Sequence, residues 1–261
     1  MTTLTAVRPA EKPWIRVVAP VVVGLVIFAL WVLVVDVLKV APRALPSPFA
    51  VVNEIVLHLD IIWEDMAITA GNSLAGLAAG TIVAILFAAL AATFRPIDGM
   101  LAPLVAAIAV VPIVAITPIL NTMFGASSQF GRQAVAAIAA FVPVFVNVLR
   151  GLRQTRPVHR DLLRASGASG IQTFRVLTLP TALPYLLTGL RIASSIAVIA
   201  ALVAEYFGGP ADGIGTAIAT YAKSGRAALA FAYVAGGIAI GLVFFLVTTL
   251  LERLVTRRGP V

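Results

Sequence analysis

Four ionisable residues lie inside or at the ends of long apolar segments, and they are the first candidates for chemistry in this chain. A charged side chain within a membrane is costly and usually marks a functional or structural polar site. Asp36 and Glu252 lie near segment ends, where their carboxylates can reach lipid headgroups. Arg191 can either snorkel to the surface or pair within a helix bundle. Glu205 is either a carboxylate at the membrane surface, bonded to helix ends, or the centre of a buried polar site.

Residue types that support catalysis or metal binding are scarce in this sequence. Cysteine is absent, which excludes disulfides, thiolate metal sites and cysteine nucleophiles. The two histidines, His58 and His159, lie far apart, so a haem or zinc site is not expected. No Gly-Lys dipeptide occurs, so the chain has no phosphate-binding P-loop. We expect no catalytic residue, metal or cofactor here, and any ATP and magnesium that drive the protein must be bound by another subunit.

Uncharged polar residues within the apolar segments have two interpretations. They can line an aqueous path, or they can form hydrogen bonds between helices, and the sequence does not separate these alternatives. The main candidates are Asn72, Ser73, Asn121, Ser194 and Ser195.

The elements that position these residues must be membrane helices. The chain is 61% hydrophobic and only 11% charged, with mean hydropathy +1.04, whereas soluble domains carry about a quarter charged residues. We therefore expect an all-α integral membrane protein. Helices that cross a bilayer need about 20 apolar residues, and six segments qualify: Val17–Leu38, Ala67–Phe94, Met100–Leu120, Ala134–Leu149, Leu183–Phe207 and Ala228–Leu251.

The basic residues determine the expected orientation. The net charge is +8, but Lys and Arg gather in the loops between apolar segments, a pattern of topology control that argues against nucleic-acid binding. With six spans and an inside N-terminus, thirteen of these residues fall inside, five fall outside, and Arg191 lies within a span. The sequence thus predicts a multi-pass protein of the inner (plasma) membrane with both termini cytoplasmic.

The same count divides the chain into parts. Residues 1–16 form a cytoplasmic tail, 17–38 an anchor helix, 39–66 an extracytoplasmic segment, 67–253 the core, and 254–261 a second cytoplasmic tail. Within residues 39–66, apolar residues from Phe49 to Ile62 recur at helical spacing, which predicts an amphipathic helix on the outer surface.

Residues 155–180 form an unusually long polar loop with two short helix patterns, which we call the coupling segment. Pro157 suits a helix start, and Gly167 can end that helix in a left-handed conformation. Ser169 and Gln172 have the spacing of a capping box for a second helix. Leu179 precedes Pro180, which predicts that the second helix stops there, and we expect Pro184 in the first turn of the next span.

Two functions fit such a loop. It can be an interfacial helix pair whose arginines contact anionic lipid headgroups. Alternatively, it can dock into a cytoplasmic partner and transmit a rigid-body motion into the membrane.

The segment Asp161–Pro184 resembles the cytoplasmic EAA loop of ABC-importer permeases, with Leu162 and Leu163 in place of two alanines. The residues on that pattern are Asp161, Gly167, Ala168, Ser169, Phe174, Leu179, Pro180 and Pro184. Other motifs resemble those of one branch of these permeases, which transports nitrate, sulfonates, taurine and thiamine precursors. They are Leu45-Pro46-Ser47-Pro48, Phe124-Gly125, Thr188-Gly189-Leu190-Arg191, Ala204-Glu205 and Gly213-Ile214-Gly215. This branch often has an arginine after Ser73-Leu74, where this chain has Ala75-Gly76-Leu77.

The resemblance implies a type I ABC importer permease fold of six transmembrane helices with cytoplasmic coupling helices. It implies that ABC ATPase subunits receive the coupling segment, that an extracytoplasmic solute-binding protein delivers a small organic solute, and that a second permease copy completes a dimer in the membrane lipid. It also favours a gate or structural role for Glu205, and Arg191 is a second candidate for such a role. The solute is pyrimidine- or vitamin-like, or sulfonate- or nitrate-like, and the missing arginine favours the first kind.

An ion-coupled secondary transporter is the alternative function. It would be expected to show inverted repeats and acidic sites at the membrane midplane. An intramembrane enzyme is a third hypothesis, and it would need a cluster of His, Asp, Glu or Ser within the spans.

Overall fold

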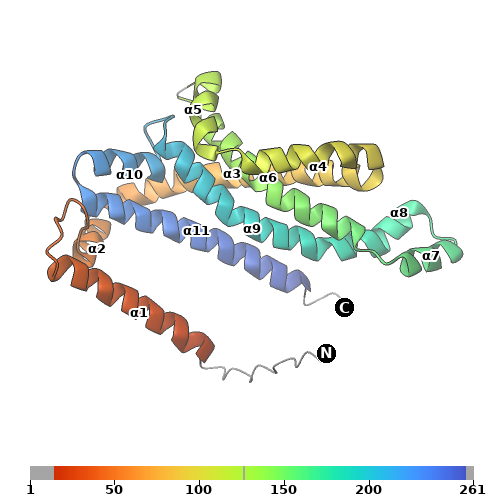
Figure 1. Cartoon of the computed structure of the whole chain (residues 1–261), viewed down its shortest axis with the longest axis horizontal. Helices are drawn as coiled ribbons and strands as arrows, with labels where there is room; N and C mark the ends of the chain where they lie inside the picture. Colours follow the sequence, from red (N-terminus) through yellow and green to blue (C-terminus); the bar gives the residue numbers. More distant parts are fainter. Residues whose placement is uncertain (1–14, 126, 257–261) are drawn as a thin grey trace, which may run out of the picture.

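The structure is a computed structural model that describes residues 15–125 and 127–256, and this part of the chain is helical throughout apart from turns. Four long helices, α3, α6, α9 and α11, run side by side along the long axis of the molecule (Figure 1). The elements are α1 (Ile15–Asp36), α2 (Pro48–Leu57), α3 (Leu59–Thr93), α4 (Arg95–Val110), α5 (Ile113–Phe124), α6 (Phe130–Arg153), α7 (Pro157–Ala165), α8 (Gly170–Thr173), η1 (Phe174–Thr178), α9 (Leu179–Tyr206), α10 (Ile214–Lys223) and α11 (Ala227–Thr256).

The membrane-spanning helices agree with an all-α integral membrane fold. Within the described residues, five helices are long and apolar enough to cross a membrane, and a sixth is obtained if α4 and α5 count as one span. The third span expected over Met100–Leu120 is not a single helix: it corresponds to α4 and α5, which meet at an angle of 95°. The physical reason is Pro112: it has no amide hydrogen, and Val111 before it is extended, with φ −68° and ψ 126°.

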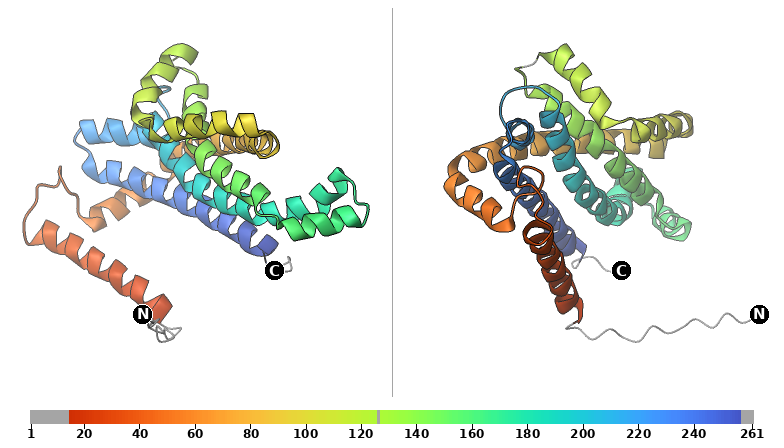
Figure 2. Two further views of the ribbon diagram at one scale, coloured as in Figure 1. Left: turned by 45° about the vertical axis from the view of Figure 1, so that its right-hand side comes forward. Right: turned by 60° about the vertical axis from the view of Figure 1, so that its left-hand side comes forward.

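The N-terminal helices contact the bundle mainly at one end. α1 lies apart from the other long helices along most of its length (Figure 2). Near its C-terminal end, the Trp31 indole donates to the carbonyl of Pro46 (3.1 Å) and its ring lies 6.2 Å from that of Phe231. The amphipathic helix expected through Ile62 is shorter than predicted: α2 ends at Leu57, and Ile62 is buried in α3.

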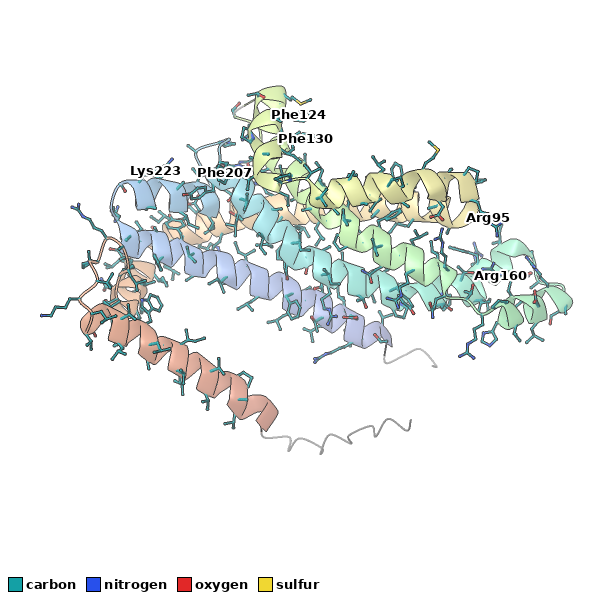
Figure 3. All side chains as sticks on the ribbon, viewed as in Figure 1. Arg95, Phe124, Phe130, Arg160, Phe207 and Lys223 are labelled. Carbon is teal, nitrogen blue, oxygen red and sulfur yellow. The ribbon has the colours of Figure 1, made fainter. Side chains whose placement is uncertain are left out.

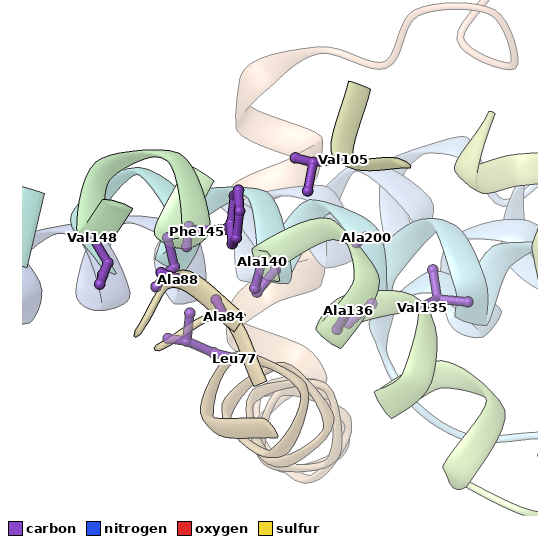
Figure 4. Packing of buried hydrophobic residues seen from close by; sticks show 14 of the residues in the cluster. Leu77, Ala84, Ala88, Val105, Val135, Ala136, Ala140, Phe145, Val148 and Ala200 are labelled. Atoms are coloured by element: carbon purple, nitrogen blue, oxygen red, sulfur yellow. The ribbon is translucent and has the colours of Figure 1, made fainter. Parts of the chain in front are cut away.

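The core is built on close contacts between small residues. Alanines at the centre of α3, α6 and α9 are fully buried, among them Ala84, Ala136 and Ala197, and Figure 4 shows this layer. A Cβ on Gly76 would lie 2.4 Å from the Cβ of Ala136, and one on Gly80 would lie 2.4 Å from the carbonyl oxygen of Ala137. The Gly76-x-x-x-Gly80 motif therefore packs α3 against α6 within one chain, as helices do where lipid provides no hydrophobic driving force.

Replacing Gly80 with alanine tests this contact. Because the added methyl group would overlap the backbone of α6, we expect Gly80→Ala to destabilise the protein by about 1–3 kcal/mol. Gly71→Ala is the matched control, since it lies on the same helix and a Cβ there meets nothing within 4 Å. Thermal unfolding in detergent should show a lower Tm for Gly80→Ala only; equal Tm values would contradict the close packing.

Candidate functional site

The first half of the coupling segment is a short helix closed by a glycine. α7 begins at Pro157 and carries no buried side chain. Gly167 has φ +75°, its amide donates to Arg164 O, and the amide of Ala168 donates to Leu163 O, all at hydrogen-bond distance. This is a Schellman motif, which only a left-handed residue can form without strain. The predicted end of the helix at Gly167 is confirmed.

The second half differs from expectation at its end. The capping box is present: Ser169 Oγ accepts from the Gln172 amide (3.3 Å) and the Gln172 side chain accepts from the Ser169 amide (2.7 Å). The predicted stop at Leu179-Pro180 is wrong, since α8 continues through the π-helical turn η1 directly into α9. In the wider turn, the amide of Leu179 donates to Phe174 O, five residues earlier, instead of to the carbonyl four residues earlier. The helix therefore passes through Pro180, although proline normally disturbs the regular α-helical turn before it. Pro184 consequently lies inside α9, beyond its first turn.

Apolar side chains of the coupling segment face solvent rather than the bundle. Leu162 on α7 is 65% exposed and Ile171 on α8 is 68% exposed. Phe174 and Leu179 are also exposed, while Leu163 and Ala168 are partly buried. Figure 3 shows Arg160 in this segment and Arg95 at the same end of the molecule. We call this end the α7–α8 end, and the opposite one, which carries Lys223, the α10 end.

The coupling segment connects two helices that pack tightly against each other. It joins the end of α6 to the start of α9. A Cβ on Gly151 would lie 2.7 Å from the Cβ of Tyr185 and 3.0 Å from the Cα of Ala182. A force applied to the exposed loop is therefore transmitted to two helices that cannot easily separate.

At the α10 end, Glu205 is the centre of a buried polar cluster. Its side chain is 1% exposed, although it lies on a helix that crosses the membrane. Oε2 accepts from the Thr69 hydroxyl (2.8 Å) and from the Gly215 amide (2.9 Å), and Oε1 lies 3.5 Å from Asn72 Nδ2. Thr69 Oγ1 in turn accepts from the Ile214 amide (2.9 Å). Glu205 and Thr69 thus hold the first amides of α10 against α3 and α9.

Arg132 extends this cluster, and the sequence analysis missed its role. The predicted fourth span started at Ala134, which placed Arg132 in an outside loop, but α6 starts at Phe130 and Arg132 is fully buried. Its guanidinium donates to Asp212 (2.6 Å), to Gln129 (3.0 Å) and to the Pro210 carbonyl. An arginine two residues before an apolar run, with a glutamine three residues before the arginine, was the available signal.

Arg191 pairs within the bundle rather than reaching the surface alone. Its Nε lies 3.1 Å from Glu252 Oε2, and Thr188 donates to Glu252 Oε1 at 2.6 Å. One turn further on, Ser194 Oγ lies 3.1 Å from Thr248 Oγ1. These contacts join α9 to α11 toward the α7–α8 end. Glu252, expected at the headgroups, is therefore a partner of α9.

The candidate path-lining residues lie in different environments within the described part of the chain. Asn72 is bonded to Gln129 and Gln133, and Ser73 donates to the Thr69 carbonyl, so both have partners between or within helices. Ser195 lies in a mostly apolar groove between α9 and α11. Asn121 is buried, with Oδ1 close to Gly131 and no hydrogen-bond partner among the described residues. A path-lining role for these residues and for Ser194 stays a prediction.

Within residues 15–125 and 127–256, no three His, Asp or Glu side chains are placed to hold a metal ion together.

Substitution of Glu205 tests the polar cluster. Glu205→Ala would leave the Gly215 amide and the Thr69 hydroxyl without an acceptor, and each lost partner costs about 1–3 kcal/mol in a buried site. Glu205→Gln keeps an oxygen for both donors, so we expect a smaller loss. Thermal unfolding and limited proteolysis of residues 207–213 should rank the variants as Ala below Gln below wild type. Equal stability of Glu205→Ala and wild type would show that the cluster does not hold α10.

Several curated proteins are similar to this chain. A formylaminopyrimidine transport permease of Halalkalibacterium halodurans is 33% identical over 168 residues, covering 64% of this chain and 67% of that protein. A probable ABC transporter permease of Haemophilus influenzae is 29% identical over 201 residues, covering 77% and 81%. A riboflavin transport system permease of Chloroflexus aurantiacus is 29% identical over 215 residues, covering 82% and 80%.

Solved structures show the same fold. An amino acid ABC transporter superposes with a TM-score of 0.62 at 18% identity, over 76% of this chain and 96% of that chain. The MetNI methionine ABC transporter, in an inward-facing conformation, gives a TM-score of 0.57 at 18% identity, over 80% and 98%. Residues 76–258 match the family described as "Binding-protein-dependent transport system inner membrane component", and the chain therefore belongs to this family of ABC-importer permeases.

Proposed function

We propose that this permease carries a small heteroaromatic organic solute into the cell and is driven by a separate ATPase subunit that binds the coupling segment. The observation that carries the proposal is the coupling segment itself. Its short helical elements expose Leu162, Ile171 and Phe174. These elements are attached to α6 and α9, which pack closely against each other. An apolar surface of this kind is unfavourable in water and fits a protein groove.

The proposed mechanism follows from this geometry. ATP draws two ATPase subunits together, and each coupling segment moves with its subunit. Because the segment is continuous with α6 and α9, both helices move as one body. A second copy of the chain forms the other wall of the path, in the surrounding lipid. The solute arrives from an extracytoplasmic binding protein, and no step requires chemistry from this chain.

The solute class rests on the relatives and on one sequence feature. Two of the relatives above carry formylaminopyrimidine and riboflavin in their names, and both compounds contain a pyrimidine ring. The sequence lacks the arginine after Ser73-Leu74 that would favour a small anion. ATP hydrolysis by the reconstituted complex should therefore be stimulated by a binding protein loaded with a pyrimidine-like solute more than with a sulfonate.

Gly167→Pro tests the coupling segment. Proline cannot adopt φ +75° and lacks the amide that closes α7, so the Schellman motif is lost. We expect loss of solute-stimulated ATP hydrolysis in proteoliposomes, with the Tm of the membrane bundle within about 2 °C of wild type. Gly170→Ala is the control, because a Cβ there meets nothing within 4 Å. Full stimulation in Gly167→Pro, or transport by the chain alone on an ion gradient, would overturn the proposal.

Single cysteines test the proposed orientation, since the natural chain has none. We expect Val158→Cys, on the exposed face of α7, to react with an impermeant maleimide only in inverted vesicles. Lys39→Cys, before α2, should react only in right-side-out vesicles. Arg95 and Arg160 lie at the α7–α8 end and Lys223 at the α10 end (Figure 3), which agrees with the excess of basic residues inside. The reverse labelling pattern would contradict the proposed orientation.

A further inference from the structure

A second ionic contact lies at the base of the coupling segment, apart from the clusters described above. Arg153 is the last residue of α6, two positions before the start of the coupling segment. Its Nη2 lies 2.8 Å from Asp98 Oδ1 in the first turn of α4 and donates to the carbonyl of Ala91 (3.2 Å) in the last turn of α3. One guanidinium therefore joins the ends of three helices.

Both contacts of Arg153 suit the helix ends that they join. The last carbonyls of a helix lack partners within the helix, and Arg153 satisfies one of them at the end of α3. Asp98 lies where the α4 dipole favours a negative charge. The contact is partly exposed, at 46% for Arg153 and 34% for Asp98, so its effect on overall stability is small. The contact matters because it links α6 to α4.

α4 is attached to the bundle through one apolar face, on which Leu101 and Val105 are buried. Between it and α3, α5 and α6 lies a cavity of about 460 Å³, lined only by apolar side chains and glycine, including Phe87, Leu104, Ile116 and Phe141. The cavity is open to the surface, where Phe87 and Leu104 are 39% and 53% exposed, so α4 can move toward it at lower cost than through a packed core. Within the described residues, Arg153 makes the only ion pair of α4 to another helix.

α4 also reaches toward the opposite end of the molecule. It bends at Val111-Pro112 into α5, whose Asn121 packs against Gly131, next to Arg132 of the buried cluster. A displacement of α6 at Arg153 would thus move α4, and through the bend α5, near the place where α10 is held.

We infer that the Arg153–Asp98 pair transmits the motion of the coupling segment to the broken helix α4–α5. Asp98 and Arg153 are positioning residues: they contact no solute and act through α4. The inference rests on the proposed function, because it requires an ATPase to move the coupling segment.

The test is a double-mutant cycle of Asp98→Asn, Arg153→Gln and the double variant, each assembled with the ATPase subunit in proteoliposomes. We expect each single variant to lower stimulation by solute-loaded binding protein between about twofold and thirtyfold, at unchanged basal hydrolysis. The double variant should be no worse than either single one, since both remove the same contact. Arg150→Gln is the matched control, an exposed arginine three residues earlier on α6 with no ion pair among the described residues.

A distance measurement separates transmission from a merely structural role. Spin labels on Met100→Cys of α4 and Leu74→Cys of α3, both exposed positions, should change separation between the nucleotide-free and ATP-bound states in the wild type. The change should be absent in Asp98→Asn. Likewise, Ala79→Leu, which narrows the cavity, should lower stimulation more than Ala78→Leu; both positions are exposed, but only Ala79 lines the cavity.

The outcomes distinguish the two proposals. If the wild-type complex is not stimulated, the proposed function fails. If the wild type is stimulated and the Asp98 and Arg153 variants equal it, or their effects simply add, only the present inference is overturned. An unchanged Met100–Leu74 response in Asp98→Asn, or equal effects of Ala79→Leu and Ala78→Leu, would also overturn it.

Discussion

The close approach of α6 to α3 and α9 is the constraint on which the rest of the structure depends. In a membrane, lipid tails are as apolar as leucine, so helices associate through dispersion contacts, and small residues bring their backbones together. Gly76, Gly80 and Gly151 leave no room for a Cβ, and the alanines at the core of these helices, such as Ala84 and Ala136, are fully buried. Because α6 and α9 also carry the coupling segment, this packing makes one rigid body of that segment and the helices that cross the membrane.

Polar contacts complete this body at its two ends. At the α10 end, Glu205 and Arg132 bind the amides, carbonyls and side chains of residues 210–216, which have no regular partner where the chain turns back into the bundle. At the α7–α8 end, Arg191–Glu252 joins α9 to α11, and Arg153–Asp98 joins α6 to α4. Backbone groups at helix ends lack partners within their own helix, and these polar contacts satisfy some of them.

The helices at the periphery have a different character. α1 contacts the bundle through Trp31, which packs near Phe231 of α11, and α4 rests over an apolar cavity. The central body is therefore close-packed, while the broken helix α4–α5 has room to change position. A transporter needs both properties, because a rigid body transmits motion only if other helices can change position when it moves.

The sequence by itself determined the membrane class, the short helices of the coupling segment, their ends at Gly167 and Ser169, and the family, because these follow from composition, local capping and ordered motifs. It did not predict the 95° bend at Pro112, and it predicted a helix end at Pro180 where a π-helical turn continues the helix instead. Only the tertiary structure decided that Arg132, Arg153 and Glu252 are paired. Their partners lie 80, 55 and 61 positions away in the sequence, and the pairing depends on helix packing, which local patterns do not record.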